Sequence, residues 1–162
     1  MAPTRPVIGA PTEAEWGQAV HDAVFTPRGA RVAGGTSTAV GTTMEQLQLN
    51  TAVDDPGGWL SSDHIELPTG STGLYDWNLE VQTDNGDDGD FTKIQLRVNG
   101  ASAKTFRIAN EGTTAVVEGR SGLIQLDAGD IITVYAAKTG GLDPDVTVLA
   151  LSLLRRGDEV GA

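Results

Sequence analysis

The chain has 162 residues, which suits one domain with a short appendage, and it contains no cysteine, so disulfides and thiolate metal sites are excluded. No apolar run in the sequence approaches the roughly 18 residues that a membrane helix requires. Eleven lysines and arginines stand against 22 aspartates and glutamates, and the resulting net charge of −11 argues against nucleic acid as a partner.

Residues 1–11 contain Pro3, Pro6 and Pro11. Proline fixes φ and removes a backbone donor, so this stretch is predicted to be extended. It has too few bulky apolar residues to fold alone. It also lacks the apolar core of a signal peptide, so nothing in it is expected to direct secretion or membrane insertion.

Residues 13–25 are predicted to form a short helix, begun by a Thr–Glu capping box and ended by a proline. Trp16, Val20 and Val24 recur at every fourth position and share one apolar face. An isolated helix of this length must bury that face in order to persist in water. We therefore predict that residues 1–28 form an attachment arm whose partner-binding residues are Trp16, Val20 and Val24. The alternative is that the helix packs on its own domain.

From residue 30 onward the pattern is typical of β-structure, with turn signals about every 8–12 residues. The clearest strand covers residues 74–83, where apolar and polar side chains alternate strictly. Asn99 and Gly100 together are a strong type I′ hairpin signal. The side chains predicted to be buried are the inward-facing apolar residues of these strands: Tyr75, Trp77, Leu79, Val81, Ile94, Leu96, Val98, Phe106, Ile108, Leu126, Ile132 and Val134.

Three local motifs occur in a familiar order. Residues 68–75 read PTGSTGLY, residues 96–100 read LRVNG, and residues 126–134 read LDAGDIITV. Together they resemble the motifs of the tumour-necrosis-factor-like and complement-globular-head jelly rolls, in the form found in bacteriophage virion proteins. The resemblance covers about residues 29–156. It implies a trimer with a binding or structural role.

The predicted fold is therefore all-β. It is a jelly-roll sandwich of eight to ten antiparallel strands over residues 29–156. The arm and its short helix occupy residues 1–28, and residues 157–162 form a polar C-terminal tail.

The last predicted strand, residues 146–154, is apolar on both faces. Leu149, Leu151 and Leu153 share one face, and Val146, Val148, Ala150, Ser152 and Leu154 are expected on the other. Neither face suits water over that length, so one must meet the core and the other a subunit neighbour or the arm helix. A neighbour is favoured because the family resemblance implies a trimer. Leu149, Leu151 and Leu153 are the predicted oligomer interface.

An acidic turn contains Asp84, Asp87, Asp88 and Asp90. Carboxylate-rich loops bind Ca²⁺, but the EF-hand pattern fails because residue 86 is glycine and residue 95 is not glutamate. A solvated turn rich in turn-forming residues is favoured, and no metal site is predicted.

The sequence contains only weak indications of a catalytic site. The segment 119–122, Gly-Arg-Ser-Gly, lacks the spacing of a nucleophile elbow. His21 and His64 have no triad partners nearby in the sequence. Trp59 is either a binding-site aromatic or a cover for the end of the barrel, and the cover is favoured. The protein is predicted to be no enzyme and to hold no cofactor.

The predicted function is that of a structural virion protein, namely a trimeric capsid decoration protein that binds the outer surface of a phage head through its arm. Its predicted partners are the major capsid protein or another virion protein, and itself as a homotrimer, with no nucleic acid and no membrane. Assembly is expected in the host cytoplasm, and the acidic surface suits the capsid exterior. The alternative is a minor tail or fibre protein whose jelly roll binds a host receptor or carbohydrate.

Overall fold

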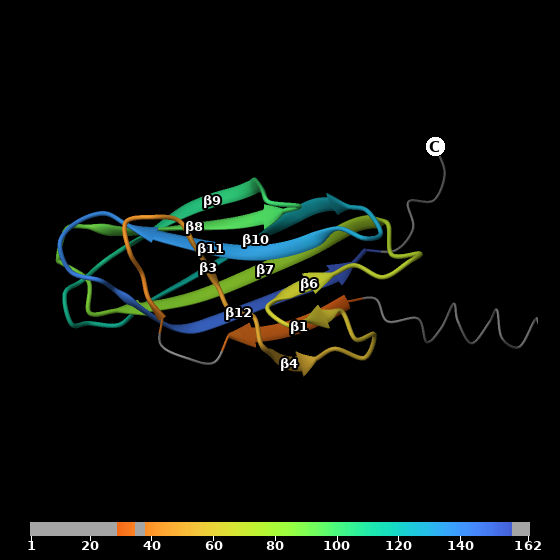
Figure 1. Ribbon diagram of the computed structural model, residues 1–162, viewed down its shortest axis with the longest axis horizontal. Helices are drawn as coiled ribbons and strands as arrows, with labels where there is room; N and C mark the ends of the chain where they lie inside the picture. Colours follow the sequence, from red (N-terminus) through yellow and green to blue (C-terminus); the bar gives the residue numbers. More distant parts are fainter. Residues whose placement is uncertain (1–28, 35–37, 157–162) are drawn as a thin grey trace, which may run out of the picture.

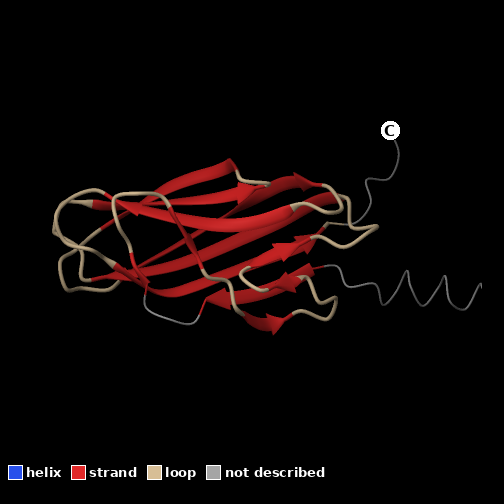
Figure 2. Ribbon diagram, in the orientation of Figure 1, coloured by secondary structure: helices blue, strands red, loops and turns tan. Residues whose placement is uncertain are grey.

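A computed structural model describes residues 29–34 and 38–156 of the chain. The predicted arm with its helix at 13–25 and the predicted tail at 157–162 lie outside these residues. Every regular element in the described part is a strand, and the loops gather at the two ends of the molecule (Figure 2). No helix long and apolar enough to cross a membrane occurs in residues 29–34 and 38–156.

Two antiparallel sheets form a sandwich, with β4 and β9 on opposite sides of the molecule in Figure 1. Sheet A runs in the order β10 (Val116–Leu126), β7 (Gly73–Asp84), β12 (Asp145–Arg155), β1 (Gly29–Gly34) and β4 (Thr51–Asp54), with β2 (Thr38–Ala39) beside β12. Sheet B runs in the order β5 (Leu60–Ser61), β6 (His64–Glu66), β11 (Ile131–Lys138), β8 (Phe91–Val98) and β9 (Ala101–Ala109), with β3 (Glu45–Leu47) beside β11.

This architecture confirms the all-β jelly-roll prediction. The described residues form twelve strands rather than eight to ten, and β2 and β5 have only two residues each. Residues 116–126 form the single long strand β10. Asn99 and Gly100 join β8 to β9 with φ values of 51° and 80°, as a type I′ turn requires at both central positions.

The core lies between the two sheets and is built by period-two alternation. Tyr75, Leu79 and Val81 of β7 are fully buried, whereas Asn78 and Glu80 between them face outward. Ten of the twelve side chains predicted to be buried are buried, and Val98 and Phe106 pack partly buried against the same cluster. The cluster also contains residues that the sequence did not single out, among them Val32, Leu47, Leu49 and Leu67.

Leu96→Ala is expected to lower the free energy of unfolding by about 2–5 kcal/mol, because it removes buried methyl groups and leaves a cavity. Leu96 is 0% exposed in the middle of β8. Val98→Ala on the same strand is the matched control and should cost less, because Val98 is only partly buried. Urea denaturation of the two variants measures the difference. Equal stability of Leu96→Ala and wild type would contradict this account of the core.

Candidate interaction surfaces

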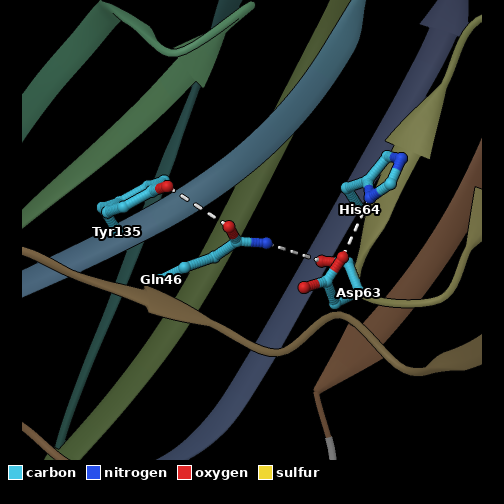
Figure 3. A network of polar contacts seen from close by, with 4 residues as sticks. All are labelled: Gln46, Asp63, His64 and Tyr135. Atoms are coloured by element: carbon cyan, nitrogen blue, oxygen red, sulfur yellow. Dashed lines mark hydrogen bonds and ion pairs between the residues drawn. The ribbon is translucent and has the colours of Figure 1, made fainter.

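His64, one of the two histidines considered for catalysis, belongs to a polar chain that ties β3 to its neighbours (Figure 3). The Tyr135 hydroxyl donates to Gln46 Oε1 at 3.2 Å, and Gln46 Nε2 donates to the backbone oxygen of Asp63 at 3.4 Å. His64 Nδ1 lies 2.9 Å from Asp63 Oδ1. Within the described residues Asp63 is the only side chain that hydrogen-bonds to His64. His21 lies outside the described residues.

The Gly-Arg-Ser-Gly segment lies inside β10, not at a strand-to-helix turn. Ser121 pairs with Asn78 of β7 in regular antiparallel register. Arg120 NH1 lies 2.8 Å from Glu118 Oε2 on the same strand. A nucleophile elbow needs a sharp turn that projects its serine, and a continuous strand does not provide one.

The acidic turn is tied to a neighbouring loop through Asp87. One oxygen of this carboxylate accepts the backbone N–H groups of Gly141 at 3.0 Å and Leu142 at 2.7 Å. Lys138 donates to the Gly141 carbonyl at 2.8 Å and pairs with Asp143. No group of three or more His, Asp or Glu side chains suited to a metal ion occurs in the part of the chain that the structure describes.

Trp59 covers one end of the sandwich, so the favoured of its two interpretations is confirmed. Its side chain is buried, and its ring packs edge-on against Tyr75 with centroids 6.0 Å apart. The Asp55 carboxylate fixes the loop by accepting the N–H groups of Trp59 and Leu60 at 2.7 and 2.8 Å. Burial raises the pKa of the Tyr75 hydroxyl, which donates to the backbone carbonyl of Ser71.

The structure assigns the two apolar faces of β12 the other way round from the prediction: the face predicted to meet a neighbouring subunit points into the core. Leu149, Leu151 and Leu153 are 3%, 0% and 2% exposed and belong to the protomer's own core. Buried inside one protomer, they have no surface to offer a neighbouring subunit. A β-bulge between Val146 and Val148 turns Val146 inward and leaves Val148 37% exposed. The face of β12 that a neighbour can reach is therefore the opposite one.

That opposite face forms part of a broad surface, which we call the outer face of sheet A. Glu80, Ala150 and Ala33 form one row across β7, β12 and β1, and Asn78, Ser152 and Arg31 form the next. A hollow of about 280 Å³ lies at the centre, over Arg31, Asn78, Glu80, Ala150, Leu151 and Ser152. Large apolar side chains flank it with considerable exposure: Val117 57%, Leu123 43%, Val148 37% and Leu154 57%.

At one end of this face, Arg156 donates to Asp76 Oδ2 at 2.7 Å, and this hydrogen bond raises the pKa of the guanidinium further. The two charges of the central rows, Glu80 and Arg31, are of opposite sign, so this part of the face is close to neutral on an acidic chain. A nearly neutral surface with exposed apolar flanks is suited to contact with another protein.

The predicted partner-binding residues Trp16, Val20 and Val24 lie outside the described residues. Their role therefore stays a prediction from the sequence.

Comparison with known proteins supports the fold. No family model matches the chain, and no curated protein matches its sequence. Among solved structures, the globular domain of zebrafish complement 1qA protein superposes with a TM-score of 0.55 at 12% identity, covering 78% of this chain and 94% of that one. PRD1 vertex protein P5 superposes with a TM-score of 0.56 at 15% identity, covering 80% of this chain and 73% of that one. Eiger TNF from S. frugiperda superposes with a TM-score of 0.54 at 10% identity, covering 83% of this chain and 97% of that one.

Proposed function

The chain has the tumour-necrosis-factor-like jelly-roll fold, and we propose that it is a non-enzymatic structural protein of a virion. In this role it is a homotrimeric capsid decoration protein that sits on the outer surface of a phage head. The outer face of sheet A carries the proposal, because four large apolar side chains with considerable exposure flank a hollow at its centre. The likeness to a vertex protein adds support for the virion role.

In the proposed homotrimer, the outer face of sheet A meets neighbouring subunits. Val148 and Leu154 of β12 and Val117 and Leu123 of β10 are the apolar contacts, since each exposes more than a third of its side chain. They replace Leu149, Leu151 and Leu153 as interface residues. Burial of apolar side chains of this size stabilises an interface by roughly 25 cal/mol for each Å² removed from water.

Attachment to the capsid is assigned to residues 1–28. The buried cluster described in residues 29–34 and 38–156 already joins side chains of both sheets. The arm is proposed to serve a partner, with Trp16 as its anchor and Val20 and Val24 beside it. Aromatic residues commonly dominate binding energy at the centre of an interface.

Deleting the arm tests the attachment. A truncated chain that begins at Gly29 is expected to fold with nearly the same melting temperature and to lose binding to capsid shells in a sedimentation assay. Trp16→Ala in the full chain should weaken the same binding strongly, and Arg5→Ala, outside the apolar stripe, is the matched control. Unfolding of the truncated chain, or undiminished binding, would show that the arm completes the fold instead.

The second candidate function is that of a minor tail or fibre protein that binds a host receptor or carbohydrate. One observation favours it: a hollow of about 580 Å³ at the end of the sandwich, lined by residues 58–61, 66–69 and 128–129. Copy number separates the two functions. Quantitative mass spectrometry of purified particles should find the chain in numbers comparable to the major capsid protein if it decorates the head, and in few copies if it belongs to the tail.

A further inference from the structure

The β8–β9 hairpin is positively charged, unlike the chain to which it belongs. Residues 91–110 contain Lys93, Arg97, Lys104 and Arg107 and no aspartate or glutamate, although the whole chain carries a net charge of −11. Ile94 and Leu96 of β8 point into the core, so Lys93 and Arg97 lie on the outer face of sheet B. Arg107 joins them there, because it pairs with Lys93 across the hairpin.

Both arginines are held in place without an anionic partner. The Arg97 guanidinium lies 4.0 Å from the Tyr135 ring centroid, and its Nε and NH2 donate to Gln95 Oε1 at 3.0 and 2.8 Å. Arg107 lies 4.1 Å from the centroid of the Phe91 ring. Among the described residues, no carboxylate forms an ion pair with any cation of this face. Arg97 therefore has a fixed orientation, and no described residue accepts a hydrogen bond from its NH1.

The arrangement costs the isolated protomer some stability. Lys93 and Arg107 stand directly opposite each other on neighbouring strands, and like charges in that position are destabilising. The chain has twice as many acidic as basic residues, and none of the acidic residues in 29–34 and 38–156 forms an ion pair with either member of this pair. Cations that are pinned by ring stacking and left unpaired fit recognition of an external anion better than they fit a role in folding.

We infer that the outer face of sheet B, formed by Lys93, Arg97 and Arg107 over Phe91 and Tyr135, docks an extended acidic segment of a partner protein. The guanidinium fork matches a carboxylate in a bidentate geometry. Lys93 and Arg97 are four residues apart on one strand, about 13 Å, which is also the spacing of every fourth side chain of an extended peptide. A long polyanion is disfavoured, because the chain as a whole carries a net charge of −11.

The test uses the full chain and a fluorescein-labelled peptide of alternating glutamate and serine, with fluorescence anisotropy measured at low salt. The peptide is expected to bind, and the same peptide with glutamine for glutamate is not. Arg97→Gln and Arg107→Gln should each weaken binding by about tenfold or more, as loss of a charge-assisted hydrogen bond does. Lys104→Gln should leave binding within about twofold, because Lys104 pairs with Leu96 and points toward the other side of the hairpin.

Lys93→Glu separates binding from folding. It replaces the like-charged cross-strand pair with an opposite-charged one, so the melting temperature should stay the same or rise while peptide binding falls by at least about tenfold. A drop in melting temperature with unchanged binding would mean that the cations serve the fold. Equal losses for Lys104→Gln and Arg97→Gln would mean that only total charge matters. Tighter binding of single-stranded DNA or of oligogalacturonate, with the same dependence on Arg97, would assign the face to another class of partner.

Discussion

Leu151→Asp is expected to unfold the protomer rather than to separate subunits. Leu151 is 0% exposed at the centre of sheet A, where it pairs with Val32 of β1 and Leu79 of β7, both fully buried. A carboxylate placed there has no cation to pair with in this cluster of apolar side chains. An unpaired buried charge of this kind destabilises by more than about 4 kcal/mol, against a total stability of about 5–15 kcal/mol for a domain.

Circular dichroism at neutral pH measures this effect, and Leu151→Met is the matched control. The control keeps the volume and polarity of the core, so it should cost less than about 1.5 kcal/mol. A folded monomeric Leu151→Asp variant would instead mean that Leu151 faces a neighbouring subunit, which would restore the assignment made from the sequence.

Ala150→Arg is expected to have the opposite outcome, a folded protomer that no longer forms trimers. Ala150 immediately precedes Leu151 in β12, but it lies on the outer face of sheet A, between Glu80 and Ala33. A long cation there fills the central hollow and blocks close approach of a second sheet. On the isolated protomer it is tolerated, because Glu80 on the neighbouring strand offers an opposite charge.

Sedimentation equilibrium over a range of protein concentrations measures the oligomeric state. Thr105→Arg introduces the same side chain on an exposed position of β9 in the other sheet, and it should leave the trimer intact. Thr105→Arg should keep the wild-type melting temperature, and Ala150→Arg should still unfold cooperatively, with a melting temperature lowered only by the loss of the trimer contacts. The trimer is disproved if the wild-type chain is a monomer at micromolar concentration, and this interface is disproved if Ala150→Arg still forms trimers.

Local patterns determined most of the jelly roll, because each depends on residues close together in the chain. Strict alternation from Tyr75 to Val81 identified both the strand β7 and its inward face. The Asn99-Gly100 dipeptide identified the hairpin, since both residues adopt the positive φ values that such a turn needs. The burial of Leu96 and Val134 followed from the same period of two.

The surfaces were decided by tertiary structure. Period-two alternation tells which residues of β12 share a face, but both faces are apolar, so only packing against β7 and β1 shows that Leu151 points inward and Leu154 outward. The bulge at the start of β12 also shifts the alternation by one residue, which places Val146 inside and Val148 outside.

The cationic face of sheet B was missed for a related reason. The only sequence signal was the absence of aspartate and glutamate from residues 91–110, which is easily overlooked in a chain with 22 acidic residues. Arg107 and Lys93 meet only because the hairpin sets their register, and Arg97 reaches Tyr135 only because β8 pairs with β11. The sequence by itself determined the long strands and most of their inward-facing side chains, because these depend on local alternation. Tertiary structure alone decided which side chains from distant strands share a surface, because strand register and bulges bring them together.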